Sequence, residues 1–212
     1  MTERTPLIFS PGLDGDYIIP EQPGRTYGPV LQVFQAAGFQ PHFFAPEWPE
    51  RDPQKWGQGM ADYAETIARE NNSGEVAMAG FSCGALVAVL GTHALEQRQN
   101  VEVAGLVACS ISPWFGEARV RRSLLHPRSN LHQASETFQT NLRKLTLPKL
   151  TSPVQVYVGS EEMETVKAMY AETLAAWPQA EGITPPCRHD IFHEAYLRAL
   201  SQNVGKLATK AV

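Results

Sequence analysis

The segment from Val76 to Leu90 places a serine between two glycines, and this pattern constrains the fold more than any other feature of the chain. A short apolar run leads into Gly80-Phe81-Ser82-Cys83-Gly84, and a helix-period pattern follows at once. So abrupt a turn from strand to helix leaves no room for side chains at the glycine positions, and it strains the serine backbone. The serine hydroxyl is thereby exposed at the carboxyl end of the strand, facing the N-terminus of the helix. The pattern predicts the strand–turn–helix known as a nucleophile elbow.

Length and composition favour one domain over residues 1–212. The chain has 43% hydrophobic residues, which is enough for a sizeable core, and a net charge of −4, which gives no general nucleic-acid footprint. The first residues contain no long apolar run, so we expect no signal peptide, no membrane span and a cytoplasmic location. The spacing of Cys83, Cys109 and Cys187 matches neither a disulfide framework nor a zinc pattern, so we expect no metal and no cofactor.

Apolar runs alternate with amphipathic patterns along the chain. We expect strands at 7–9, 39–45, 76–81, 103–109 and 154–158, with a weaker strand pattern at 180–184. Helices are expected at 27–37, 58–70, 85–96, 164–177 and 191–206. This alternation predicts an α/β fold, with a mostly parallel six-stranded sheet and helices on both faces.

One segment, about 111–150, interrupts the alternation. About forty residues separate the fourth and fifth strands, far more than a single crossover helix needs. We therefore expect a helical lid insertion. It has seven basic and two acidic side chains, a charge of +5, which leaves −9 for the rest of the chain.

The position of a histidine base can be predicted from the order of the elements. A serine hydroxyl is a poor nucleophile at neutral pH unless a histidine accepts its proton and an acid orients that histidine. In sheets with an elbow the chain order is nucleophile, acid, base, on loops at the carboxyl ends of strands. Only His189 and His193 follow the last expected strand, and His193 is expected inside the closing helix. His189 is the predicted base.

The acid follows by elimination. No aspartate occurs between Asp62 and Asp190, and Asp190 is too close to His189 in sequence to fold back onto its ring. A glutamate just past a strand is therefore required. Glu162, three residues after the glycine that ends the fifth strand, is the predicted acid, and Glu161 is the alternative.

With these residues in this order, the whole chain resembles the α/β-hydrolase superfamily in its small six-strand form. The shared features are Pro11-Gly12 after the first strand, the elbow, the insertion at the lid position, the acid loop and the late histidine. The family usually has aspartate where Glu162 stands, and often His-Gly in the first loop. The resemblance implies an oxyanion hole formed by the backbone N–H groups of Leu13 and Cys83.

The resemblance further implies a serine hydrolase that cleaves a small carboxylic ester through an acyl-enzyme. The alternatives are thioester hydrolysis, acyl transfer with the same three residues, or a non-catalytic binding protein on a hydrolase fold. His189-Asp190-Ile191-Phe192-His193 is similar to a zinc-binding His-Glu-x-x-His helix, but the sequence offers no cluster that supplies a third ligand.

The basic insertion has two interpretations. Its charge fits a solvated face, or a docking site for an anionic substrate handle such as phosphopantetheine or an acidic acyl-carrier protein. The arginines of that docking site would be Arg119, Arg121, Arg122 and Arg128. Trp114 and Phe115, just beyond the fourth strand, either line an acyl pocket or anchor the insertion.

Overall fold

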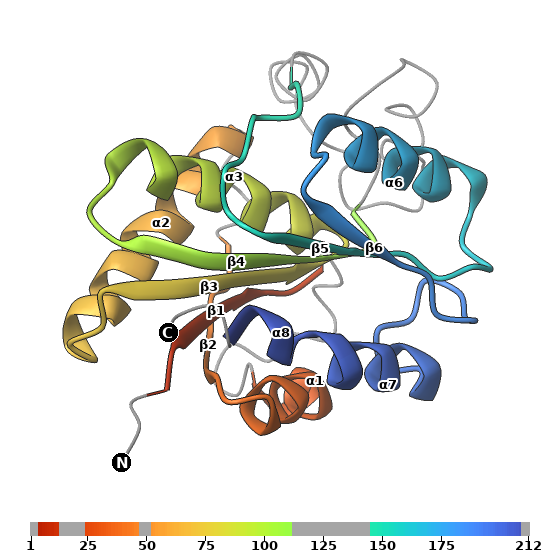
Figure 1. Ribbon diagram of the computed structural model, residues 1–212, viewed down its shortest axis with the longest axis horizontal. Helices are drawn as coiled ribbons and strands as arrows, with labels where there is room; N and C mark the ends of the chain where they lie inside the picture. Colours follow the sequence, from red (N-terminus) through yellow and green to blue (C-terminus); the bar gives the residue numbers. More distant parts are fainter. Residues whose placement is uncertain (1–3, 13–23, 47–51, 112–144, 209–212) are drawn as a thin grey trace.

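Six strands form one parallel sheet in the computed structural model, which describes residues 4–12, 24–46, 52–111 and 145–208. The sheet order is β2-β1-β3-β4-β5-β6, and all five strand pairs are parallel (Figure 1). The strands are β1 (Pro6–Ser10), β2 (Gln40–Phe43), β3 (Glu75–Phe81), β4 (Glu102–Cys109), β5 (Val154–Tyr157) and β6 (Ala180–Ile183). The sheet predicted from the sequence is confirmed, including the strand with the weaker pattern.

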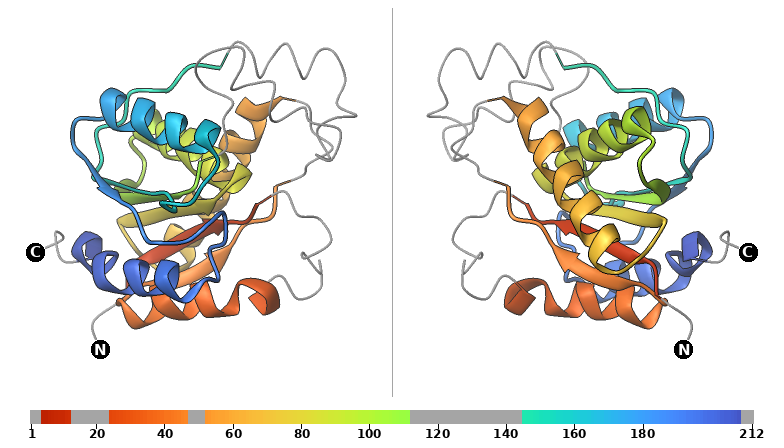
Figure 2. Two further views of the ribbon diagram at one scale, coloured as in Figure 1. Left: turned by 90° about the vertical axis from the view of Figure 1, so that its right-hand side faces the viewer. Right: turned by 90° about the vertical axis from the view of Figure 1, so that its left-hand side faces the viewer.

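Helices cover both faces of the sheet. Figures 1 and 2 show one face covered by α1 (Gly24–Ala36), α7 (Glu194–Asn203) and α8 (Gly205–Ala208). The other face carries α2 (Pro53–Glu70), α3 (Cys83–Arg98) and α6 (Glu164–Ala176). None of the described helices is long and apolar enough to span a lipid bilayer.

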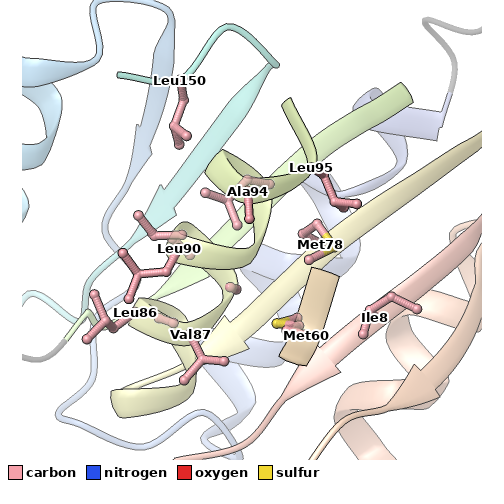
Figure 3. Packing of buried hydrophobic residues seen from close by; sticks show 14 of the residues in the cluster. Ile8, Met60, Met78, Leu86, Val87, Leu90, Ala94, Leu95 and Leu150 are labelled. Carbon is pink, nitrogen blue, oxygen red and sulfur yellow. The ribbon is translucent and has the colours of Figure 1, made fainter. Parts of the chain in front are cut away.

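The core lies in two layers, one on each face of the sheet. On one face Met60 of α2, Leu90 of α3 and Met78 of β3 belong to a single buried cluster, which Figure 3 shows from close by. On the other face Phe9, Phe34 and Tyr196 belong to a second cluster. Parallel strands between two helical layers are buried on both faces, which explains the nearly continuous apolar runs of the central strands.

The strand order reverses beside β1. The chain passes from β1 to β2 on one side, and β3 then pairs with β1 on the other side. The loops after β1 and β3 therefore lead to α1 and α3, which lie on opposite faces of the sheet (Figure 1). In open α/β sheets, ligands bind outside the carboxyl ends of the strands at such a point.

Four helices begin at other residues than the sequence pattern indicated: α1, α2 and α3 begin two to five residues earlier, and α7 begins three residues later. Helix α2 begins at Pro53 rather than at residue 58, because the Asp52 side chain caps it by accepting the N–H of Gln54 at 3.0 Å. The closing helix α7 begins at Glu194 rather than at residue 191. His193 is thus the N-cap of α7, not a residue inside it as predicted.

The predicted lid falls mostly outside the described residues, which resume at residue 145. From there residues 145–150 run without helix toward β5, and Leu145 and Leu150 are buried. The Trp177 indole N–H donates to the carbonyl of Pro148 at 2.8 Å. This end of the insertion is packed against the body of the protein.

Candidate active site

Ser82 occupies the predicted elbow between β3 and α3. Its φ and ψ are 55° and −120°, a conformation that few residues other than glycine adopt. Its backbone N–H donates to the carbonyl of Cys109, at the end of β4, at 2.8 Å. A strained conformation of this kind costs about 1–3 kcal/mol and persists only where the surroundings enforce it.

The two elbow glycines are required by close backbone contacts. A Cβ at Gly80 would lie 2.2 Å from the carbonyl oxygen of Gly84. A Cβ at Gly84 would lie 2.1 Å from the oxygen of Pro11 and 2.2 Å from that of Ser10. The reason for the glycines given from the sequence therefore holds, and the second glycine also seats α3 on the end of β1.

Gly12, which follows β1 after Pro11, lies beside the serine. A Cβ built on Gly12 would be 3.4 Å from the Cβ of Ser82. The Gly12 N–H donates to the hydroxyl of Tyr27 at 3.1 Å, so this amide is already used within the protein. Cys83 is the first residue of α3, where the amide groups and the helix dipole favour negative charge. Leu13, the other predicted oxyanion residue, lies outside the described residues.

Glu162 and His189 form a hydrogen-bonded pair. The Nδ1 atom of His189 lies 2.8 Å from Oε1 and 3.1 Å from Oε2 of Glu162. The Glu162 side chain is fully buried, whereas the histidine side chain is 31% exposed. Because a carboxylate accepts, Nδ1 is the donor and Nε2 is left as the basic nitrogen of a neutral ring.

The alternative acid, Glu161, lies elsewhere. Its side chain is 59% exposed and its carboxylate is 3.8 Å from the Nε atom of Arg188, a solvent-exposed ion pair. The structure thus brings Glu162, and not Glu161, to the imidazole.

The acid loop and the histidine loop are joined by their backbones. The N–H of Ser160 donates to the carbonyl of Pro185 at 2.8 Å, and the N–H of Glu161 donates to that of Cys187 at 2.9 Å. A Cβ on Gly159 would lie 2.3 Å from the same Cys187 oxygen. The parallel pairing of β5 and β6 therefore continues into the two loops, which positions the acid opposite the histidine.

The imidazole lies beside the elbow. The rings of His189 and Phe81 are 4.9 Å apart between centroids, with an interplanar angle of 37°. Phe81 directly precedes Ser82, so this contact brings the predicted base to the same turn as the predicted nucleophile. Three loops, after β3, β5 and β6, thus converge at the carboxyl edge of the sheet.

Two thiols near the site, those of Cys109 and Cys187, are buried. Burial raises the pKa of Cys109 to about 12, and burial together with the nearby charge of Glu162 raises the pKa of Cys187. A protonated thiol is a weak nucleophile. The serine is therefore the better candidate for the reacting group.

His189 and His193 do not share a helix face. Asp190 accepts the N–H of Phe192 at 2.9 Å in a turn, and the Nδ1 atom of His193 accepts the N–H of Ala195 at 3.2 Å. Within the described part of the chain, no group of three or more potential ligands could hold a metal ion. The similarity to a zinc-binding helix does not extend to the geometry.

Six other predicted residues fall outside the described residues: Trp114, Phe115, Arg119, Arg121, Arg122 and Arg128. Their roles stay predictions. A surface pocket of about 310 Å³ does lie in the described part, but at the amino ends of β3 and β4, opposite the site. Its lining residues are Glu65, Ala68, Arg69, Ser73, Asn100 and Val101.

Sequence reasoning missed Tyr27, which binds the first loop. Its side chain is only 5% exposed and its ring packs against Phe9, Phe43 and Phe192. A buried tyrosine hydroxyl needs a partner, but nothing in the local pattern indicates that the partner is Gly12.

Comparison with known proteins identifies the fold. No protein-family profile matches the sequence, and a search of curated proteins gave no significant match. The structure is similar to that of Est1E from Butyrivibrio proteoclasticus with bound ferulic acid, with a TM-score of 0.72, 13% identity, and coverage of 97% of this chain and 90% of Est1E. It is also similar to the esterase Pf2001 of Pyrococcus furiosus, with a TM-score of 0.64, 13% identity and coverage of 99% and 84%.

A thioesterase is among the similar structures as well. The Vlm2 thioesterase domain, solved with a dodecadepsipeptide, gives a TM-score of 0.54, 15% identity and coverage of 98% of this chain and 93% of the domain. At such identities the similarity concerns the fold. The chain has an α/β-hydrolase fold, as the sequence resemblance implied.

Proposed function

We propose that this protein is a serine hydrolase that cleaves a carboxylic ester, with Ser82 as nucleophile, His189 as base and Glu162 as acid. The observation that carries the proposal is the 2.8 Å contact between the buried Glu162 carboxylate and Nδ1 of His189. It occurs beside a serine held at a φ of 55°. The esterases with the same fold support the choice of an ester bond.

Acylation begins at the basic Nε2 of His189. Ser82 Oγ attacks the carbonyl carbon while Nε2 accepts its proton, and Glu162 stabilises the imidazolium that forms. The N–H groups of Leu13 and Cys83 are assigned to the developing oxyanion, next to the positive end of the α3 dipole. When the C–O bond breaks, the alcohol leaves with the proton from Nε2, and the acyl group stays on Ser82.

Deacylation repeats these steps with water. His189 accepts a proton from the water as it attacks the acyl carbon, and the oxyanion is held by the same N–H groups. Ser82 then leaves and recovers its proton from His189. The products are a carboxylic acid and an alcohol, and no group beyond the chain and water is consumed.

Apolar side chains next to the pair favour an ester with an apolar group. Met163 follows Glu162 directly, and Phe192 lies three residues after His189. Their exposed fractions are 63% and 39%, and they are the exposed large hydrophobic residues of the described part of the chain. Exposed apolar surface at a groove can bind an apolar ligand group, and we assign Met163 and Phe192 to this contact.

Thioester hydrolysis is the second candidate, since the Vlm2 thioesterase domain has a similar structure. The same three residues would act, with a thiol leaving in place of the alcohol. Docking of an anionic acyl carrier by Arg121 and Arg122 belongs to this candidate. Charge reversal of both arginines would lower kcat/KM for an acyl-coenzyme A, and would leave kcat/KM for a p-nitrophenyl ester unchanged.

The first experiment is intact-mass labelling with a fluorophosphonate. One adduct on the wild type is expected, with none on Ser82→Ala and an unchanged adduct on Ser201→Ala, which removes an exposed hydroxyl from α7. A folded wild type without an adduct would refute the proposal and favour a binding protein on a hydrolase fold.

The second experiment compares two neighbouring carboxylates. Glu162→Gln is expected to lower kcat by up to about 10⁴-fold, because the amide no longer holds the required histidine tautomer. Glu161→Gln is the matched control, since it removes the exposed carboxylate beside Arg188. Equal losses of kcat in the two variants would contradict the assignment of Glu162.

A further inference from the structure

Tyr196 is a buried tyrosine near the proposed catalytic residues, and it has no role in the mechanism above. It lies on α7, seven residues after His189, and its side chain is fully buried. Its hydroxyl is 3.1 Å from the hydroxyl of Ser110, the residue that follows Cys109. Either hydroxyl can be the donor of this hydrogen bond.

Ser110 directly follows Cys109, the last residue of β4, and its backbone is strained. Ser110 has a φ of 47°, in the left-handed region that favours glycine. Its N–H donates to the carbonyl of Tyr157 at 2.7 Å, and the preceding carbonyl, that of Cys109, accepts the N–H of Ser82 at 2.8 Å. The end of β4 therefore anchors the backbone of the elbow, and it needs external contacts to keep its conformation.

Tyr196 is also joined to the histidine loop, through its own helix. Helix α7 begins directly after that loop, and the N–H of Tyr196 donates to the carbonyl of His193 at 2.9 Å. Burial raises the pKa of Tyr196 well above its ordinary value, and the neighbouring Cys109 adds to this effect. The phenol is consequently neutral and can donate over the whole pH range in which the protein would work.

We infer that Tyr196 is a positioning residue. Its hydroxyl connects the end of β4, which anchors Ser82, with α7, the helix that follows His189. Nucleophile and base come from distant parts of the chain, and this side chain joins their two supports directly. Its effect on rate rests on the proposed function, whereas its effect on the conformation of the elbow does not. No step of the proposed reaction is assigned to Tyr196.

Tyr157 provides a matched control. It is also fully buried, and its ring is stacked on that of Tyr196 at 6.1 Å between centroids. Its hydroxyl, however, donates to Oε1 of Gln155 at 3.0 Å, two residues back along β5 and away from the elbow. Tyr157→Phe and Tyr196→Phe each remove one buried hydroxyl from the same layer of the core.

Reactivity, melting temperature and hydrogen exchange are measured on both variants and on the wild type. The rate of fluorophosphonate labelling and kcat for a p-nitrophenyl ester are expected to fall about tenfold in Tyr196→Phe, with KM changed less than twofold. Tyr157→Phe is expected to retain both rates within twofold at a similar loss of melting temperature. Hydrogen exchange of the peptide 76–90 is expected to accelerate in Tyr196→Phe alone, because the acceptor of the Ser82 amide shifts.

Each outcome has a defined meaning. Wild-type rates and exchange in Tyr196→Phe would overturn the inference, and so would equal losses in the two variants, which would indicate general loosening. Ser110→Ala combined with Tyr196→Phe is expected to cost little more than either change alone, because both remove the hydrogen bond between the two hydroxyls. Additive losses would also overturn the inference. A wild type that neither labels nor hydrolyses refutes the proposed function, while the exchange result still decides the role of Tyr196.

Discussion

Replacing Gly159 with alanine tests how the acid and histidine loops are held together. Gly159 follows β5 in a buried position, and its φ is not positive, so its backbone does not itself require glycine. An added Cβ would lie 2.3 Å from the oxygen of Cys187 and 2.8 Å from that of Arg188. The substitution therefore acts as a wedge between the loop of Glu162 and the loop of His189.

The size of the effect follows from these distances. Ordinary van der Waals contact at a Cβ starts at 3.4 Å, so the two loops must separate by about 1 Å. Added to the 2.8 Å contact between Nδ1 and Oε1, that displacement exceeds the reach of a hydrogen bond. A misplacement of about 1 Å can cost about 10²-fold in rate. Overpacking costs about 1–3 kcal/mol, or about 2–12 °C in Tm for a chain of this length.

The assay combines kcat/KM for a p-nitrophenyl ester with thermal unfolding. Gly74→Ala is the matched control, because a Cβ there meets no atom within 4 Å, and we expect wild-type kcat/KM and Tm. Gly159→Ala is expected to lose about 10²-fold in kcat/KM at temperatures where it is fully folded. A folded Gly159→Ala with wild-type kcat/KM would refute the view that this contact sets the distance between acid and base.

Three further predictions concern other parts of the structure. Ser82→Gly is expected to be inactive but about 1 kcal/mol more stable to denaturant than Ser82→Ala, because glycine relieves the strain at a φ of 55°. Equal stability of the two variants would contradict a strained backbone at this position. Burial lowers the pKa of His42 despite the opposing charge of Glu70, so the neutral form stabilises the fold and this stability is lost as pH falls below about 6.5. As the pH is lowered below about 6.5, the midpoint of unfolding should fall less in His42→Gln than in the wild type. Phe192→Ala is expected to raise KM for apolar esters about fivefold, corresponding to about 1 kcal/mol of lost contact, and Phe192→Leu should restore most of it.

The elbow could be predicted from the sequence because its requirements are local. Gly80, Ser82 and Gly84 lie within five residues, and each glycine is needed for a contact between neighbouring segments of backbone. The fold class was likewise readable, since strands buried on both faces leave continuous apolar runs.

Glu162 and His189 could be proposed as acid and base from their order in the chain, but their pairing depends on contacts between loops. Glu161 and Glu162 are equivalent in sequence terms, and only the turn after Gly159 directs one inward and the other to solvent. The predicted start of α7 was wrong. The turn at Asp190 and the His193 cap interrupt a pattern of apolar residues that otherwise has the period of a helix.

Tyr27 and Tyr196 could not be predicted as parts of the site. Each appears in sequence as an apolar member of a helix face, and its importance comes from a hydroxyl partner far along the chain. Gly12 is 15 residues from Tyr27, and Ser110 is 86 residues from Tyr196. Such tertiary contacts leave no periodic signal.

The place of β6 at the edge of the sheet gives the molecule two levels of stability. Within the described residues β6 pairs with β5 alone, and no residue of the strand is fully buried, whereas the elbow lies between central strands. Local opening is easiest where few apolar contacts must be broken. The edge strand and the loop after it can therefore detach His189 while the core around Ser82 stays folded. On gradual heating, we expect hydrolysis to cease several degrees before the circular dichroism signal of the helices disappears, and to return at once on cooling.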